Sequence, residues 1–279
     1  MPRELKTELK SKSRAEGKLV VLKLGGSVVT RKEKRMTPNL EAIKMLAQEV
    51  AQADVEYLII VHGGGSFGHP LAEQYRIKEG FKERSQIEGF SKTHQAMLEL
   101  NKLVVDALIQ HNIAAFSVIP SSCIVTKAGR IESLDNCQID MLLNMGLVPV
   151  LFGDAVLDGD EGFAILSGDQ LVAVLARSFK ASRIILGVDV DGLYTADPKA
   201  HSIAQPITHI TLADLKSRIS AIEQTRVTDV TGGMLGKILE LMPAIGAGIP
   251  TMIVNAGKRG NLYKALKEQE VPGTLITKE

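Results

Sequence analysis

The sequence predicts an α/β fold, a three-layer αβα sandwich around a mainly parallel sheet. Apolar runs rich in β-branched residues alternate with segments of helical period along most of the chain, and this alternation is typical of parallel sheets covered by helices on both faces. Glycine-rich stretches follow several of the apolar runs, as expected where strands end at a ligand-binding edge. The chain has 279 residues, 45% hydrophobic and 23% charged, which is ample for a buried core in one large domain or two lobes.

Residues 1–17 are polar and of mixed charge, so we expect them to form a mobile or loosely helical tail. A basic arm for an acidic partner is the alternative for this stretch. The folded domain is then expected over 18–279. A lobe boundary near residue 180 would divide it into an N-lobe at about 18–180 and a C-lobe at about 181–279.

The elements follow in order along this domain. Strands are predicted at the apolar runs, which are Leu19–Leu24, Tyr57–Val61, Ile113–Ile119, Leu147–Phe152, Arg183–Val188 and Thr251–Val254. Helices are predicted from the period of the segments between most of them, which are 38–53, 66–76, 86–110, 136–145, 167–179, 231–247 and 260–268.

Two segments break the alternation and are predicted hairpins. The first, 124–131, turns near Ala128-Gly129, and the second, 155–165, turns in the acidic stretch 158–162. Hairpins inserted into an α/β sheet are candidate lids or interface flaps.

The predicted helix at 86–110 carries one stripe of residues at steps of three and four, apolar except at His94 and Asn101. Two interpretations stay open. The two polar side chains are either hydrogen-bonded groups of the core, or part of a face that lines a ligand cleft.

Charge and composition exclude several classes of function. The net charge of +1 gives no reason to expect a nucleic-acid or membrane partner. No apolar run approaches the roughly 18 residues of a membrane span, and the N-terminus lacks the apolar core of a secretory signal. Cys123 and Cys137 have no C-x-x-C spacing and no nearby histidines, so we expect reduced thiols in a cytoplasmic protein and no structural zinc.

Glycine and lysine gather where the predicted strands end. Lys23 ends the first strand, Lys32 follows in a basic loop that could equally be a solvated charge run, and Lys237 lies just inside a predicted helix. Glycine in such loops lets backbone N–H groups approach an anion, and helix N-termini add a favourable dipole. Several such loops on one sheet edge predict a polyanionic ligand, whose phosphates the lysines suit.

Two familiar phosphate-binding motifs do not fit. The stretch from Gly63 to Gly68 matches G-x-G-x-x-G, but roughly 20 residues further on, where the dinucleotide fold needs a strand end with an acidic residue, a long helix begins instead. A dinucleotide-dependent oxidoreductase is therefore only a minor alternative. Gly232 and Gly236 are too close together for a P-loop, and Ile238 stands where Ser or Thr is required.

Two histidines flank the second glycine loop. His62 ends a buried strand and is expected to hold the loop. His69 follows Gly68 at the predicted start of a helix and precedes Pro70, a favoured first-turn residue. A histidine at that place can donate a hydrogen bond to a phosphate that backbone N–H groups already cradle.

Five stretches together resemble the amino acid kinase family, from about residue 18 to the C-terminus: KLGGS, HGGGSFGHP, LSGDQ, DVDGLYTADP and DVTGGMLGK. Within that family the histidine-containing GGGSFGH form is similar to the isopentenyl phosphate kinases, and the kinases that modify fosfomycin share a similar histidine. One departure is Gly187, where many members of the family carry Thr or Ser.

The resemblance implies an amino acid kinase-like fold, with the acceptor bound by the N-lobe and ATP by the C-lobe. It implies an ATP site made of Lys23, Gly25, Gly26, Ser27, Gly65, Asp189, Tyr194, Asp197, Pro198, Gly233 and Lys237. It implies an acceptor-phosphate site made of Gly64, His69 and Gly168. The residues expected to be catalytic are Lys23, Lys32, His69 and Lys237, with Lys32 on the phosphoryl group in flight.

Supporting roles are expected for two carboxylates and several apolar residues. Asp154 and Asp169 would orient the lysines or bind Mg²⁺ through water, with helix capping as the alternative and no direct metal ligand in the chain. A prenyl chain would need an apolar slot, for which the candidates are Phe81, Phe90, Met97 and Ile165.

The implied activity is ATP- and Mg²⁺-dependent phosphorylation of a small molecule, isopentenyl phosphate, to isopentenyl diphosphate for isoprenoid precursor synthesis in a variant of the mevalonate pathway. No general base is needed, because a phosphate monoester is already an anionic nucleophile. Alternatives are a kinase of the same fold for a phosphonate, UMP or an amino-acid carboxylate, and a non-catalytic regulatory module that binds nucleotide. A homodimer is expected by analogy with the family.

Overall fold

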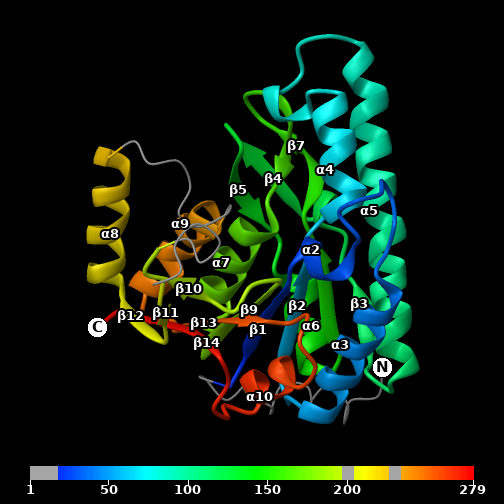
Figure 1. The fold of residues 1–279 in the computed structure, drawn as a ribbon. Coiled ribbons are helices and arrows are strands. Elements are labelled where there is room, and N and C mark those ends of the chain that lie inside the picture. The colour runs from blue at the N-terminus through cyan, green and yellow to red at the C-terminus, as the bar shows by residue number, and fades with distance from the viewer. Residues whose placement is uncertain (1–17, 197–203, 226–233) are drawn as a thin grey trace.

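The computed structural model describes residues 18–196, 204–225 and 234–279 (Figure 1). The tail expected over 1–17 and the predicted site residues Asp197, Pro198 and Gly233 lie outside the described residues.

The centre of the molecule is an eight-stranded sheet in the order β12-β14-β13-β9-β1-β2-β6-β3. Every neighbouring pair is parallel except β13 with β14, so the prediction of a mainly parallel sheet is confirmed. The strands are β1 (Val20–Leu24), β2 (Leu58–His62), β3 (Ala115–Ser117), β6 (Val148–Phe152), β9 (Arg183–Val188), β12 (His209–Thr211), β13 (Thr251–Asn255) and β14 (Gly273–Thr277).

Helices cover both faces of this sheet. Val21 of β1 packs in one hydrophobic core, while its neighbours Val20 and Leu22 pack in the other, as the two-residue period of a strand requires. The first core is covered by α6 (Cys137–Asn144), α7 (Gly168–Ser178), α8 (Leu212–Thr225) and α9 (Met234–Gly246). The second is covered by α2 (Gly26–Val29), α3 (Leu40–Ala53), α4 (Gly65–Gln74), α5 (Ser85–Gln110) and α10 (Asn261–Leu266). Figure 1 shows α8 and α9 on one side of the sheet and α3 and α5 on the other, which confirms the three layers.

A smaller sheet in the order β5-β4-β7-β8 extends from the carboxyl end of the large one. Its strands are β4 (Ile124–Lys127), β5 (Arg130–Leu134), β7 (Asp154–Asp158) and β8 (Gly162–Leu166). Both predicted hairpins are therefore confirmed, and a parallel pairing of Thr126 with Asp158 joins them into one sheet. The first turn has positive φ at Ala128 (49°) and Gly129 (72°).

Several elements were not predicted. They are α2, α8, β12, β14, the short ribbon of β10 (Leu193–Tyr194) and β11 (Pro206–Ile207), and the 3₁₀ turns η1 (Ile77–Glu79) and η2 (Pro120–Ser122). The run predicted as a strand over Ile113–Ile119 is reduced to β3 at the edge of the sheet. Because β9 pairs with β1, strands from before and after the predicted boundary near residue 180 belong to one sheet. The division into two lobes stays a prediction.

Among the described helices, none combines the length and the apolar composition that a bilayer crossing requires. Cys123 and Cys137 are both free thiols.

Candidate active site

A cavity of about 310 Å³ opens at the carboxyl edge of the central sheet. The loops after β1, β2 and β6 line it, together with the start of α7 and one residue of α9. Residues predicted for the site that share this cavity are Lys23, Gly26, Gly64, His69, Met97, Asp154, Ile165, Gly168, Asp169 and Lys237. The parallel strand order thus brings residues far apart in sequence to one place.

The loops after β1 and β2 touch through their backbones. A Cβ atom on Gly26 would lie 2.4 Å from the nitrogen of Gly65, and one on Gly63 would lie 2.8 Å from the nitrogen of Gly26. Gly65 also has a φ of +46°, and a Cβ there would lie 2.1 Å from Thr30 Oγ1. Glycine alone satisfies both the backbone conformation and the close approach. The two loops therefore form a single cradle at the rim of the cavity.

A buried carboxylate joins two of the predicted lysines. Lys23 is only 3% exposed, and its Nζ donates a hydrogen bond to Asp169 Oδ1. The Nζ of Lys237 lies 3.5 Å from the other oxygen of the same carboxylate. Asp169 does not cap α7, because the side chain of Ser167 takes that role. Of the roles expected for Asp169, orientation of the lysines is the one that its contacts favour, while binding of Mg²⁺ through water stays a prediction.

Burial lowers the pKa of Lys23 from 10.5 to about 8. This value already includes two opposing effects, because the Asp169 carboxylate raises the pKa and the nearby Lys237 lowers it. The cavity thus holds an ammonium group that is charged at neutral pH but poorly hydrated, and such a group interacts strongly with an anion.

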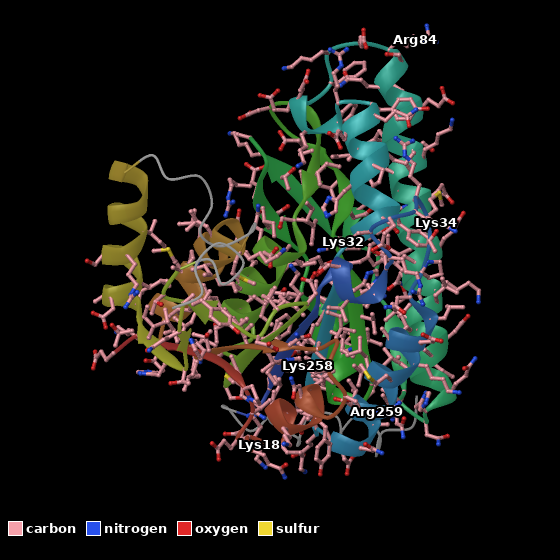
Figure 2. All side chains as sticks on the ribbon, in the orientation of Figure 1. Lys18, Lys32, Lys34, Arg84, Lys258 and Arg259 are labelled. Atoms are coloured by element: carbon pink, nitrogen blue, oxygen red, sulfur yellow. The ribbon has the colours of Figure 1, made fainter. Side chains whose placement is uncertain are left out.

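The third predicted lysine lies outside the cavity lining, in the loop after α2 (Figure 2). Lys32 Nζ donates to Asp189 Oδ2 at 2.7 Å, and Ser27 Oγ donates to Asp189 Oδ1 at 2.8 Å. The side chains of Lys32 and Asp189 are 63% and 42% exposed. Exposed pairs of this kind contribute only about 0–1 kcal/mol, so an incoming phosphate could take Lys32 from Asp189 at little cost.

His69 lies in the cavity wall on α4, but the helix begins earlier than predicted. It starts at Gly65, so Pro70 falls inside the helix and not in its first turn. Pro70 has no N–H for the Ser66 carbonyl, which instead accepts a hydrogen bond from Met36 N at 2.9 Å. This contact ties α4 to the loop that carries Lys32.

The pKa of His69 is lowered by burial and then by the charges of Lys78, Lys237 and Lys23. A neutral imidazole at pH 7 still has one N–H to donate. Lys78, from η1, also lines the cavity, and the sequence analysis did not identify it. No sequence signal marks it, because it lies in an irregular, charged stretch between two helices.

His62 is fully buried and contacts only the protein interior. Its ring nitrogens lie 3.2 Å from the carbonyl oxygen of Gly63 and 3.2 Å from Asn101 Oδ1. Burial lowers its pKa to about 4. These contacts are what the predicted loop-holding role requires, and Asn101 is one of the two polar residues of the α5 stripe.

The other polar residue of that stripe corrects the role expected for Asp154. His94 Nδ1 lies 2.9 Å from Asp154 Oδ1, and the same carboxylate accepts from the amides of Ala155 and Ser121. Burial raises the pKa of Asp154. Among the described contacts, Asp154 has no lysine partner and instead ties α5 to the start of β7. The other role expected for it, binding Mg²⁺ through water, stays a prediction.

The apolar part of the cavity lining includes Met97 and Ile165 together with Ala72 and Ala164. The other two candidates for a prenyl slot, Phe81 and Phe90, are not part of the lining, because both rings pack against Phe163. Glycines of α4 allow Met97 to approach, since a Cβ on Gly68 would lie 2.8 Å from its sulfur.

Two further expectations concern the nucleotide side and metals. Tyr194 is half-buried on β10, opposite Pro206. Within the described ranges, no group of three or more His, Cys, Asp or Glu side chains could hold a metal ion.

Known proteins resemble this chain in sequence and in fold. A profile of the amino acid kinase family matches residues 18–255. The chain is 42% identical to isopentenyl phosphate kinase from Methanothermobacter thermautotrophicus over 93% of this chain and 99% of that protein. A crystal structure described as isopentenyl phosphate kinase superposes with a TM-score of 0.82 at 38% identity, covering 92% of this chain and 100% of the other. A UMP kinase from Bacillus anthracis has the same fold, with a TM-score of 0.62 at 20% identity over 94% and 96% of the two chains.

We expect the side-chain ammonium of Lys23 to titrate near pH 8 in the ligand-free protein, as followed by ¹⁵N NMR of the lysine side chains. Asp169→Asn should lower this midpoint, because the carboxylate stabilises the charged lysine. Lys237→Met should raise it, because a neighbouring positive charge is removed. Midpoints that stay equal in all three proteins would contradict the described cluster.

Proposed function

Because this chain belongs to the amino acid kinase family, we propose that it is an ATP-dependent kinase that phosphorylates isopentenyl phosphate to isopentenyl diphosphate. A phosphate oxygen of the acceptor attacks the γ-phosphorus of ATP, the bond from that phosphorus to the β–γ bridging oxygen breaks, and ADP leaves. The observation that carries this proposal is a single cavity whose lining combines cations, Lys23, Lys78 and Lys237, with apolar side chains such as Met97 and Ile165. The product would enter isoprenoid precursor synthesis.

The cationic residues of the lining suit phosphate groups. Gly64 and Gly168 line the cavity, and no described group accepts a hydrogen bond from the amide of either residue. Both lie at the starts of helices, where amides and the helix dipole favour an anion. Together with the side chain of His69, these amides would hold the acceptor phosphate.

The apolar residues of the lining suit a short branched hydrocarbon chain. Met97, Ile165 and the two alanines present no charge to it, whereas UMP or an amino acid would leave polar groups there without partners. This argues against the two alternative acceptors. Lys78, whose charge acts on His69, also lines the cavity and would add a charge contact to the acceptor phosphate.

The ATP side would use the residues that follow β1 and β9. Lys23, Gly25, Gly26 and Ser27 would hold the phosphates, and Lys237 the phosphoryl group from the opposite side. The ATP contacts proposed for Gly65, Asp189, Tyr194, Asp197, Pro198 and Gly233 rest on the family resemblance. Lys32 would leave Asp189 and contact the phosphoryl group in flight.

Such a transfer needs in-line positioning and neutralisation of negative charge, and no general base. Lys23 and Lys237 supply fixed positive charge where burial strengthens it. Mg²⁺ would supply further charge neutralisation, held by the nucleotide phosphates through water and not by a cluster of side chains, in keeping with the donor set of the described residues.

Cellular setting and assembly are inferred from the free cysteines and from exposed apolar side chains. Both cysteines are free, which suits the reducing cytoplasm. Phe116 on the edge strand β3, Met141 on α6 and Met145, which follows that helix, are exposed. Exposed apolar side chains of this kind suit a contact with a second copy of the chain, and we therefore infer a homodimer.

The proposal is tested by an assay of ADP release over a panel of acceptors: isopentenyl phosphate, fosfomycin, UMP, glutamate and aspartate. We expect turnover with isopentenyl phosphate at a kcat/KM at least about a hundredfold above that with any other acceptor. Turnover with another member alone would replace the acceptor. Nucleotide binding without any turnover would favour a regulatory module, and binding of NADH or NADPH in a fluorescence titration would favour an oxidoreductase.

We expect His69→Ala to lose most of its activity, by about a hundredfold in kcat/KM for the acceptor, because a donor to the acceptor phosphate is removed. ATP affinity by calorimetry and the melting temperature should be close to those of the wild type. His111→Ala is the matched control, since His111 lies at the end of α5 away from the cavity. Wild-type turnover in His69→Ala would contradict the role of His69 as phosphate donor.

A further inference from the structure

The turn of the β4–β5 hairpin reaches the cavity and is held in place by two side chains. Gly129 lines the cavity. The carboxylate of Asp158 accepts hydrogen bonds from the amides of Ala128 and Gly129 at 3.1 and 2.8 Å. Gln170, which is 4% exposed on α7, accepts from the amide of Ile131 at 2.7 Å and donates to the carbonyl of Gly129 at 3.1 Å. The residue between these anchors therefore has a fixed backbone.

That residue is Arg130, and its guanidinium forms a two-pronged contact with α9. Its two terminal nitrogens lie 2.7 and 2.8 Å from the two oxygens of Glu240. Glu240 follows Lys237 by nearly one helical turn, so the two side chains share one side of α9. Figure 1 shows the hairpin standing beside this helix.

This contact differs from an ordinary surface ion pair. Exposed pairs contribute little because both side chains must be ordered and water screens the charges. Here the Arg130 side chain is 60% exposed, but its backbone is already fixed and the Glu240 side chain is only 24% exposed. The bidentate geometry also fixes orientation, which a single hydrogen bond does not.

The orientation of α9 is what such a contact can control. Buried apolar residues hold the helix against its neighbours, including Ile238 and Leu241. The hydrophobic driving force is non-directional, and the bidentate pair adds a directional contact to this packing. Rotation would move Lys237 relative to Asp169, the carboxylate that it approaches at 3.5 Å.

We propose that Arg130 and Glu240 are positioning residues that set the rotation of α9 and thereby hold Lys237 over the cavity. The pair connects the nucleotide-side lysine to the small sheet, whose strand β8 supplies Ile165 at the acceptor end. Its catalytic consequence rests on the proposed kinase function, whereas its effect on Lys237 does not.

The first test needs no substrate. The side-chain ammonium of Lys23 is titrated by ¹⁵N NMR in the ligand-free wild type and in Arg130→Met. Because Lys237 lowers the pKa of Lys23, displacement of Lys237 should raise the midpoint toward the value of Lys237→Met. A midpoint equal to that of the wild type would overturn the proposal, whatever reaction the protein performs.

The second test measures turnover. Arg130→Met and Glu240→Gln should lower kcat by about tenfold with KM for both substrates changed by less than about threefold, because positioning of the moving group is lost while binding is retained. Reversal of the pair, Arg130→Glu with Glu240→Arg, should recover most of the loss. Glu268→Gln is the control, since it breaks the contact of Glu268 with Arg183 at 2.6 Å away from the cavity, and it should leave kcat unchanged.

A purely structural pair would lower the melting temperature of the single variants and leave kcat unchanged, and that result would overturn the proposal. A reversed pair no more active than the single variants would also overturn it. Absence of turnover in the wild type would remove the proposed function alone, because the titration of Lys23 still decides the positioning role.

Discussion

The site depends on one buried carboxylate that faces two lysines. Lys23 is taken out of water at the end of β1, and among the described contacts it is the one with Asp169 that offsets the loss of hydration. Removal of one partner from a buried ion pair typically costs about 3–5 kcal/mol. The same carboxylate holds Lys237 from a helix that follows much later in the sequence. The Asp169 carboxylate therefore offsets the repulsion between two positive charges that line one small cavity. A bound anion would neutralise both charges.

Around this cluster, glycine loops and buried side chains determine the shape of the cavity. The backbone contact of Gly26 with Gly63 and Gly65 joins the loops after β1 and β2, and the buried His62 holds the second loop from behind. The two loops form a cradle at the rim of the cavity, and Met97 adds an apolar surface to its lining. Cations and hydrocarbon in one cavity lining are what the proposed acceptor, a prenyl phosphate, would need.

Much of this arrangement could be predicted from local sequence signals. Strand and helix periods gave the layers, and lysines next to glycine-rich strand ends marked the cationic edge. Helix α8 was missed although Thr211 and Asp214 form a capping pair at its start, a signal that the sequence does contain. Contacts set by tertiary structure could not be predicted in this way: the pairing of Asp154 with His94, the entry of Lys78 into the cavity wall, and the packing of aromatic rings away from the cavity.

The central claim is that Asp169 serves catalysis by holding the two lysines at the transferred phosphoryl group. It is tested most directly by rapid-quench measurement of phosphoryl transfer in a single turnover of Asp169→Asn, with the affinity for ATP measured by calorimetry on the same protein. The account predicts that the transfer step slows by about a hundredfold or more while the dissociation constant of ATP changes by less than about tenfold. Transfer at the wild-type rate in a folded Asp169→Asn protein would contradict it.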